Sequence, residues 1–201
     1  MPLTYLALGD SYTIGEGVLI TETFPYQAMQ MLRTKNFEIA APEIIAKTGW
    51  TTDELLDAME QHQFLLKYDV ATLLIGVNNQ YRSRSVDNFA EEFEMILKKT
   101  IELCNKNARH VFVLSIPDWG KTPFALGKNI EKIEEEINAF NATVKSIAAK
   151  YGCSYINITD TQRADANDHL FLAEDNLHPS AMEYAKWALI VSQKISELHF
   201  A

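Results

Sequence analysis

Hydrophobic residues along the chain gather in five short runs that are separated by longer amphipathic stretches. The runs occupy Thr4–Leu8, Glu43–Lys47, Val70–Ile75, His110–Ile116 and Cys153–Ile158. The third and fourth, VATLLI and HVFVLSI, are almost continuously apolar rather than alternating, which is typical of strands buried on both faces of a parallel sheet. We therefore expect five strands, of which Glu43–Lys47 has the weakest pattern.

Between these runs, apolar residues recur at spacings of three and four, which predicts amphipathic helices. The pattern extends from Ser85 to Asn107 and, most regularly, from Asn129 to Lys150, with another helical stretch at Thr51–Gln61. Pro25 and Pro179 each suit the first turn of a further helix. Strands that alternate with helices predict a three-layer α/β domain built on a mainly parallel sheet.

The composition is that of a globular protein with a sizeable core. The chain has 201 residues, 47% of them hydrophobic and 22% charged, which suits one domain and leaves little room for two. We therefore expect a single domain over residues 1–201. The formal charge of −9 and the scattered Lys and Arg residues provide no basic stripe, so nucleic acid is not an expected partner.

Other classes of protein are not indicated by the sequence. No run of about 18 apolar residues is present, and the start MPLTYLALGD lacks a basic segment and a signal-like apolar stretch, so we expect no membrane insertion and a cytoplasmic location. A secreted or periplasmic location would require a leader removed from this sequence.

Metal-ligand spacings are absent, and no metal or cofactor is expected. Cys104 and Cys153 are expected to be reduced and buried, although the sequence does not decide whether they meet.

The first hydrophobic run leads into YLALGDSYTIGEG, which places an acid and a hydroxyl where a buried strand ends. Asp10 and Ser11 are both typical of turns and helix caps. Phosphate-binding motifs fail here, because no lysine completes a Walker A sequence after Gly9 and no third glycine stands at Ile20. The alternative is a serine nucleophile, which needs a base, a group that orients the base, and donors for an oxyanion.

A histidine suits the base, because its imidazole accepts and returns a proton near neutral pH. His178 ranks first of the five histidines, since Asp175 precedes it by three residues and a loop with this spacing lets the carboxylate reach the ring. His169 follows Asp168 directly and ranks second, because adjacent side chains rarely share an orientation. The plainer interpretation of D-x-x-H is a surface acid before a helix start.

Two further polar stretches follow predicted strands and could supply oxyanion donors. Gly49 lies in AKTGWTTDELL after the second strand, and Gly76 and Asn78 lie in LLIGVNNQYR after the third. Each is an ordinary turn residue by itself. Because parallel strands end at one edge of the sheet, we expect these residues near Ser11.

These pieces resemble the SGNH (GDSL-type) hydrolase family. That family has a G-D-S block, a glycine, a G-x-N-D block and a D-x-x-H block in this order. The corresponding residues here span nearly the whole chain: Gly9-Asp10-Ser11, Gly49, Gly76-Val77-Asn78-Asn79 and Asp175-Asn176-Leu177-His178.

The resemblance implies a flavodoxin-like α/β/α sandwich and a serine esterase that hydrolyses an ester or thioester of a small-molecule substrate. Ser11 would attack the acyl carbon, His178 would act as general base and then general acid, and Asp175 would orient His178. The oxyanion hole would consist of the Ser11 and Gly49 backbone N–H groups and the Asn78 side chain. The family usually has an aspartate where this chain has Asn79, which concerns the positioning of the Asn78 loop rather than the reaction class.

The substrate is not determined by the sequence, and lysophospholipids, acyl-CoA, acetylated sugars and aryl esters all fit. Candidate substrate-binding residues, taken from the loops and motifs around the site, are Asp10, Trp50, Asn79, Trp119 and Phe124. The simpler role of Asp10 is to hold the turn before Ser11. Two alternatives remain: a catalytically silent carbohydrate- or lipid-binding module on the same fold, and a flavodoxin-like nucleotide or flavin binder.

Overall fold

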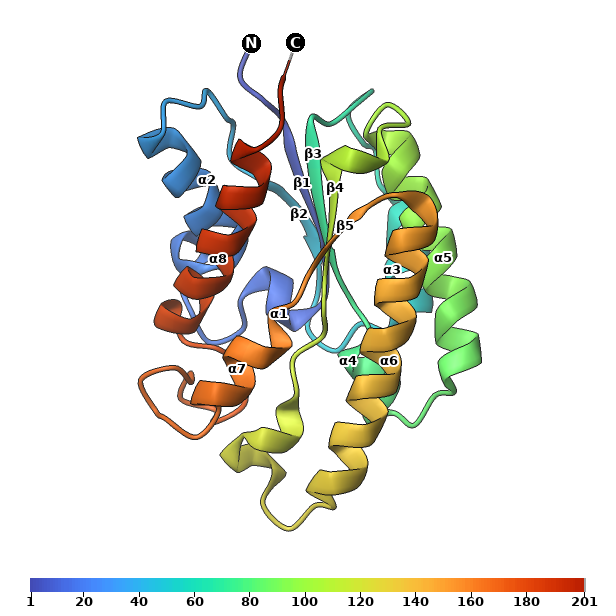
Figure 1. Cartoon of the computed structure of the whole chain (residues 1–201), viewed down its shortest axis with the longest axis vertical. Helices are drawn as coiled ribbons and strands as arrows, with labels where there is room; N and C mark the ends of the chain where they lie inside the picture. The colour runs from blue at the N-terminus through green and yellow to red at the C-terminus, as the bar shows by residue number, and fades with distance from the viewer. Residues whose placement is uncertain (201) are drawn as a thin grey trace.

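A sheet of five parallel strands lies between two layers of helices in the computed structural model, which describes residues 1–200 (Figure 1). The strands are β1 (Tyr5–Gly9), β2 (Glu43–Ala46), β3 (Val70–Leu74), β4 (Val111–Leu114) and β5 (Ser154–Ile156). They lie in the order β2-β1-β3-β4-β5, which is the flavodoxin-like order. The predicted three-layer α/β/α sandwich is therefore confirmed, and every strand pair is parallel.

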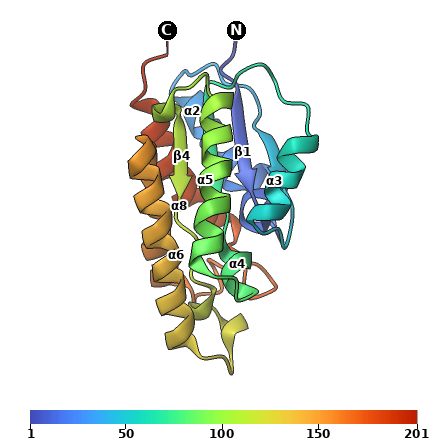
Figure 2. The same cartoon turned by 90° about the vertical axis from the view of Figure 1, so that its right-hand side faces the viewer.

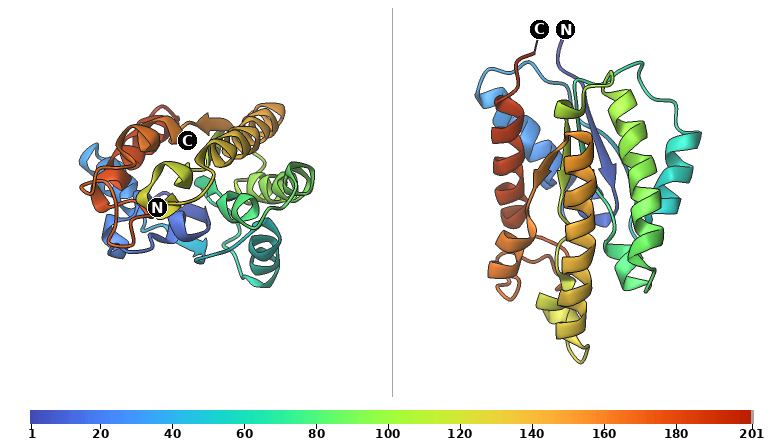
Figure 3. Two further views of the ribbon diagram at one scale, coloured as in Figure 1. Left: turned by 90° about the horizontal axis from the view of Figure 1, so that it is seen from below. Right: turned by 45° about the vertical axis from the view of Figure 1, so that its right-hand side comes forward.

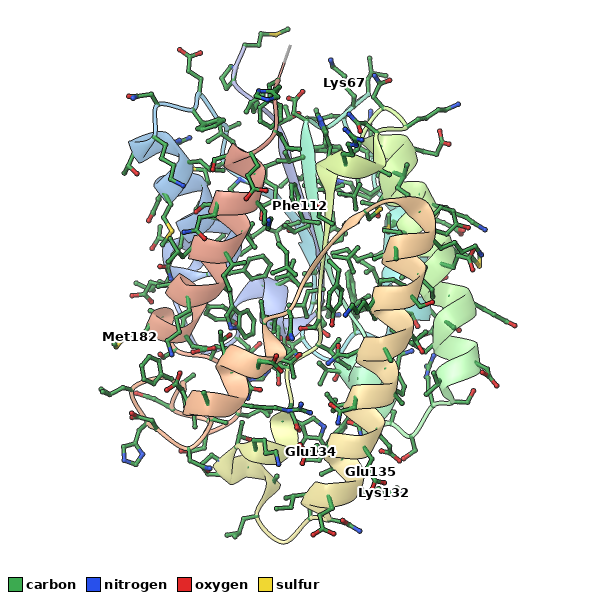
Figure 4. All side chains as sticks on the ribbon, in the orientation of Figure 1. Lys67, Phe112, Lys132, Glu134, Glu135 and Met182 are labelled. Atoms are coloured by element: carbon green, nitrogen blue, oxygen red, sulfur yellow. The ribbon has the colours of Figure 1, made fainter. Side chains whose placement is uncertain are left out.

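Burial of the strands explains the strength of their sequence patterns. All residues of β1, β3 and β4 are buried, as their continuous apolar runs predict. The residues of β2, at one edge of the sheet, are only partly buried, and this accounts for its mixed sequence. Phe112 of β4 lies between the helical layers near the centre of the molecule (Figure 4).

The helices divide between the two faces of the sheet. One layer contains α2 (Phe24–Thr34) and α8 (Ala181–Ser196), with α7 (Thr159–Asp165) below α8 in Figure 1. The other contains α3 (Thr52–Gln61), α5 (Val86–Leu103) and α6 (Ile130–Tyr151), with α4 (Val77–Tyr81) at its lower end (Figure 2). A four-residue α1 (Ser11–Ile14) follows β1, and short 3₁₀ turns include η3 (Trp119–Lys121) and η4 (Pro123–Ala125).

The helix boundaries follow local signals, with two differences from the sequence prediction. The helix predicted to reach Asn107 ends at Leu103, because Asn105 and Lys106 adopt positive φ angles of 54° and 61° and turn the chain. Pro179 does not open the last helix. It pairs with Leu172 in an isolated antiparallel bridge, and Ser180 caps α8 by accepting a hydrogen bond from the Met182 backbone N–H.

Strand register brings the candidate site together. Gly9 pairs with Ala46 of β2 and with Leu74 of β3, so these three strands end at the same level. The segments that follow them therefore leave the same edge of the sheet, where flavodoxin-like folds bind ligands. Both termini lie at the opposite end of the molecule (Figures 1 and 3).

Candidate active site

Ser11 lies at a sharp turn directly after β1. Asp10 caps α1, and its Oδ1 accepts a hydrogen bond from the Tyr12 backbone N–H over 3.0 Å. Residue 9 must be glycine, because a Cβ there would come within 2.3 Å of the Leu74 carbonyl oxygen. The close approach of β1 to β3 and the short helix together place the Ser11 hydroxyl at the carboxyl edge of the sheet.

His178 reaches Ser11 from the loop that precedes α8. Its Nε2 lies 2.9 Å from Ser11 Oγ, and its Nδ1 lies 2.5 Å from Asp175 Oδ2. The other carboxylate oxygen of Asp175 accepts the backbone N–H groups of Leu177 and His178, both over 2.9 Å. The D-x-x-H spacing therefore closes a small turn that fixes the carboxylate and the ring relative to each other.

The electrostatics of this turn favour an ionised Asp175. Partial burial opposes ionisation, but the hydrogen bonds from the His178 side chain and from the two backbone N–H groups outweigh it and hold the pKa of the carboxyl below its usual range. A negative charge is thus held against Nδ1. It favours the tautomer that carries its proton there and would stabilise a cationic ring.

Gly49 and Asn78 come from the loops after β2 and β3. Gly49 has a φ of 84°, a left-handed conformation that glycine adopts without strain, and its carbonyl accepts a 2.6 Å hydrogen bond from Arg82. Asn78, in α4, donates from Nδ2 to the Trp50 carbonyl over 3.0 Å, with Asp10 Oδ2 at 3.5 Å. Ser11, Gly49, Asn78 and His178 all line one pocket of about 190 Å³.

Asp10 lies beneath this pocket and does not line it. The side chain is completely buried, and burial raises the pKa of its carboxyl to about 7, although hydrogen bonds from Tyr12 and Asn78 partly oppose the shift. With one carboxylate oxygen on the α1 cap and the other facing Asn78, Asp10 contacts two loops of the site. It is a structural neighbour of the pocket through Asn78 and is not one of its lining residues.

Asn79 is also completely buried and does not line the pocket. Its Oδ1 accepts the Thr52 backbone N–H over 3.1 Å, and its Nδ2 donates to Thr52 Oγ1 over 2.6 Å. The pair joins α4 to the start of α3. Trp50 lies on a separate groove formed with Ile44 and Ile45 beside the edge strand. Neither Asn79 nor Trp50 is among the residues that line the pocket beside Ser11.

Aromatic and aliphatic side chains form most of the pocket wall. Trp119 and Phe124, both proposed from the sequence, lie on it. Tyr81 is there as well, because it follows Asn78 by three residues and shares its face of α4. Site-lining residues that sequence reasoning did not propose are Tyr12, Thr48, Val77 and Leu177. Each of these adjoins a motif residue in the sequence, and that adjacency is the signal that could have identified them.

The other histidines lie outside this pocket. The His62 ring contacts Glu43 over 2.6 Å, and the His110 ring contacts the Asp69 carbonyl over 2.6 Å. His169, which ranks second in the sequence, is not among the pocket-lining residues. The geometry thus singles out His178 as the imidazole next to Ser11.

The chain belongs to the GDSL-like lipase/acylhydrolase family, whose sequence model matches residues 7–186. Membership of this family makes the chain an ester hydrolase. No curated protein sequence matches the chain significantly.

Solved structures share the fold at low sequence identity. The lipase/acylhydrolase from Enterococcus faecalis superimposes with a TM-score of 0.75 at 18% identity, covering 97% of this chain and 96% of the other. An acetylxylan esterase from Geobacillus stearothermophilus gives 0.74 at 16% identity, with 96% and 94% covered. Phospholipase A1 from Streptomyces albidoflavus NA297 gives 0.73 at 17% identity, with 96% and 100% covered.

No helix among residues 1–200 combines the length and the apolar character needed to cross a bilayer.

Proposed function

We propose that this chain hydrolyses carboxylic esters or thioesters through an acyl-enzyme on Ser11, with His178 as proton carrier and Asp175 as orienting acid. The observation that carries the proposal is the continuous contact from Ser11 Oγ to His178 Nε2 and from His178 Nδ1 to Asp175 Oδ2. A serine hydroxyl is a weak nucleophile unless an adjacent base takes its proton. His178 is the base in contact with it.

In the first half-reaction, Ser11 Oγ forms a bond to the acyl carbon while its proton moves to His178 Nε2. The tetrahedral intermediate collapses, the bond to the leaving oxygen or sulfur breaks, and the leaving group takes that proton from His178. In the second half-reaction, His178 removes a proton from water as the water oxygen attacks the acyl carbon. The second tetrahedral intermediate collapses, the bond between the acyl carbon and Ser11 Oγ breaks, His178 returns the proton to Ser11 Oγ, and the carboxylic acid is released.

The oxyanion formed in both steps needs donors that are already in place. Ser11 is the first residue of α1, so its backbone N–H has no acceptor within the helix. Gly49 and Asn78 line the same pocket as Ser11. Asn78 Nδ2 donates to the Trp50 carbonyl over 3.0 Å and, over a longer 3.5 Å, to Asp10 Oδ2, so a substrate oxyanion would replace Asp10 as the acceptor of the second amide proton.

The test is hydrolysis of p-nitrophenyl acetate by the wild type and by Ser11→Ala. We expect kcat to fall on the order of 10⁴–10⁶-fold in this variant, as in other serine hydrolases that lose the nucleophile. Ser85→Ala is the matched control, since Ser85 caps α5 and does not line the pocket, and the variant should keep its activity. If the two variants retain equal activity, or the wild type has none on any ester, the silent binding module is the better account.

A further inference from the structure

Trp119 separates the pocket beside Ser11 from a second hollow. The first has a volume of about 190 Å³, and the second, of about 390 Å³, lies between α4 and the start of α6. Trp119 and Tyr81 line both. These two rings therefore form a partition, with the reactive groups on one side and a solvent-open groove on the other.

The partition extends into an aromatic wall across the pocket. The Tyr81 and Trp119 ring centroids are 5.2 Å apart, and those of Trp119 and Phe124 are 6.0 Å apart, both in edge-to-face arrangements. The backbone N–H of Phe124 donates to the Asn176 carbonyl over 3.2 Å. The wall thus runs from the helix that carries Asn78 to the loop that carries His178.

A polar relay, buried at Gln80 and partly exposed at Glu136, fixes the Trp119 ring. Its indole Nε1 donates to Gln80 Oε1 over 2.7 Å, and Gln80 Nε2 donates to Glu136 Oε2 of α6 over 2.7 Å. Rotation of the indole would leave the buried Gln80 oxygen without a donor, which is costly in a dry environment. The α6 end that carries Lys132 and Glu134 is visible at the bottom of Figure 4.

The backbone of Trp119 is held as firmly as its ring. The Asp118 carboxylate is completely buried, caps η3 through the Gly120 N–H and accepts a 2.9 Å hydrogen bond from Arg163. Gln162 Oε1 accepts the Asp118 N–H over 3.0 Å. Trp119 is thus only 5% exposed although it lines a pocket. Because hydrogen bonds fix both the indole N–H and the neighbouring backbone, the Trp119 ring keeps one position at the boundary of the pocket.

We propose that Trp119, oriented by Gln80 and Glu136, sets the size of the apolar group that the ester may carry next to its carbonyl. This inference rests on the proposed ester hydrolysis and names the substrate class for that site. A cavity of about 150 Å³ accepts benzene, so a pocket of about 190 Å³ holds roughly six to eight heavy atoms. Substrates with a short aliphatic or an aryl group are the class that fills it, and longer chains meet the indole.

The experiment measures kcat/KM along two ester series at one pH. One series varies the acyl chain of p-nitrophenyl esters from acetyl to decanoyl, and the other varies the alcohol of alkyl acetates. Comparing the two series shows whether the acyl group or the alcohol group of the ester enters the pocket beside Ser11. In the wild type, each methylene that enters raises kcat/KM about fourfold, up to an optimum near butanoyl to hexanoyl or the equivalent alcohol. Beyond that length the gain stops.

Trp119→Ala joins the pocket to the outer groove, so the optimum in one of the two series moves to longer chains. The ratio of kcat/KM for octanoyl over butanoyl, or for the matching alcohols, rises at least about tenfold. Gln80→Met removes the acceptor of the indole N–H and gives the same shift more weakly. Tyr151→Ala, at the far end of α6, is the matched aromatic control and leaves the chain-length profile unchanged.

Thermal unfolding shows which variants are folded, and Trp119→Phe provides a milder substitution if the alanine variant does not fold. Folded variants that hydrolyse the acetyl ester yet keep the wild-type length profile in both series would overturn the role of Trp119. An absence of Ser11-dependent hydrolysis in the wild type would instead overturn the proposed function. The two failures are therefore distinguishable.

Discussion

Asn79 departs from the aspartate of the G-x-N-D block described above, and its contacts provide a quantitative test of how the site is assembled. The Asn79 side chain is completely buried and donates to Thr52 Oγ1 over 2.6 Å. Thr52 Oγ1 in turn donates its own proton to Glu92. The hydroxyl therefore accepts from an amide and donates to a carboxylate, and this order requires a neutral amide at residue 79.

Asn79→Asp would place two carboxylates around one hydroxyl proton. Only one of the two carboxylates could accept the Thr52 hydroxyl proton, although Glu92 would keep its hydrogen bond from Asn88, and a buried carboxylate would replace a satisfied amide. An unsatisfied buried group costs about 1–3 kcal/mol and more when it is charged, so we expect Asn79→Asp to lower the free energy of unfolding by about 2–4 kcal/mol. Since Thr52 begins α3 directly after the Gly49 turn, kcat/KM should fall as well.

A second substitution can reverse the direction of this hydrogen-bond chain. In Asn79→Asp combined with Glu92→Gln, the glutamine amide donates to Thr52 Oγ1 and the threonine proton passes to the aspartate. We expect the double variant to recover about 1–3 kcal/mol relative to Asn79→Asp alone, a coupling typical of residues in one network. Glu92→Gln alone should change stability by less than about 1 kcal/mol, because Glu92 is partly exposed and its ion pair with Arg84 is 3.9 Å long.

Urea unfolding at pH 7, fitted to a two-state transition, measures these differences. An Asn79→Asp variant as stable as the wild type would refute the assigned direction of the hydrogen bonds. So would a double variant that is no more stable than the single one.

Three further predictions concern the site. Asn78→Ala should lower kcat about 10²–10³-fold on p-nitrophenyl acetate, and a loss below threefold would exclude Asn78 as an oxyanion donor. Asp175→Asn should leave thermal unfolding nearly unchanged while kcat falls on the order of 10⁴-fold, because the amide supports the wrong tautomer of His178. Unchanged kinetics would refute the orienting role of Asp175. Asp10 has a pKa of about 7 in the folded chain against 3.8 ordinarily, so the folded state binds more protons and its stability falls as pH rises from about 4 to 7. Asp10→Asn should flatten that fall, which amounts to on the order of 2–4 kcal/mol by urea unfolding, and an unaltered pH profile would contradict the shift.

Much of the fold could be predicted because its signals are local. The continuous apolar runs of β3 and β4 and the stripe of α6 are set by residues three or four apart, and each element formed close to its expected bounds. The contact of His178 with Asp175 also lies within four residues. The contact of His178 with Ser11 spans 167 residues, and the expectation of it came from the order of motifs along the chain.

The parts that escaped prediction depend on which way a side chain turns within a short element. All of α4 looked like a loop, yet one turn of helix directs Asn78 and Tyr81 to the pocket and buries Asn79 and Gln80 behind it. Trp50 lies next to Gly49 in sequence but packs beside the edge strand. No periodicity predicts these side-chain directions within the five residues of α4, because the hydrogen-bond partners of Asn78, Asn79 and Gln80 lie 27 to 68 residues away in the sequence.

The central claim is that Ser11 is the residue acylated during turnover. The most direct measurement is to react the protein with a fluorophosphonate, which modifies activated serine hydroxyls, and to locate the adduct by peptide mass spectrometry while residual esterase activity is followed. The account predicts one adduct per chain, on Ser11, with activity lost in proportion to labelling and no adduct in His178→Ala. Complete inactivation with the adduct on another residue, or hydrolysis that persists after Ser11 is fully labelled, would contradict it.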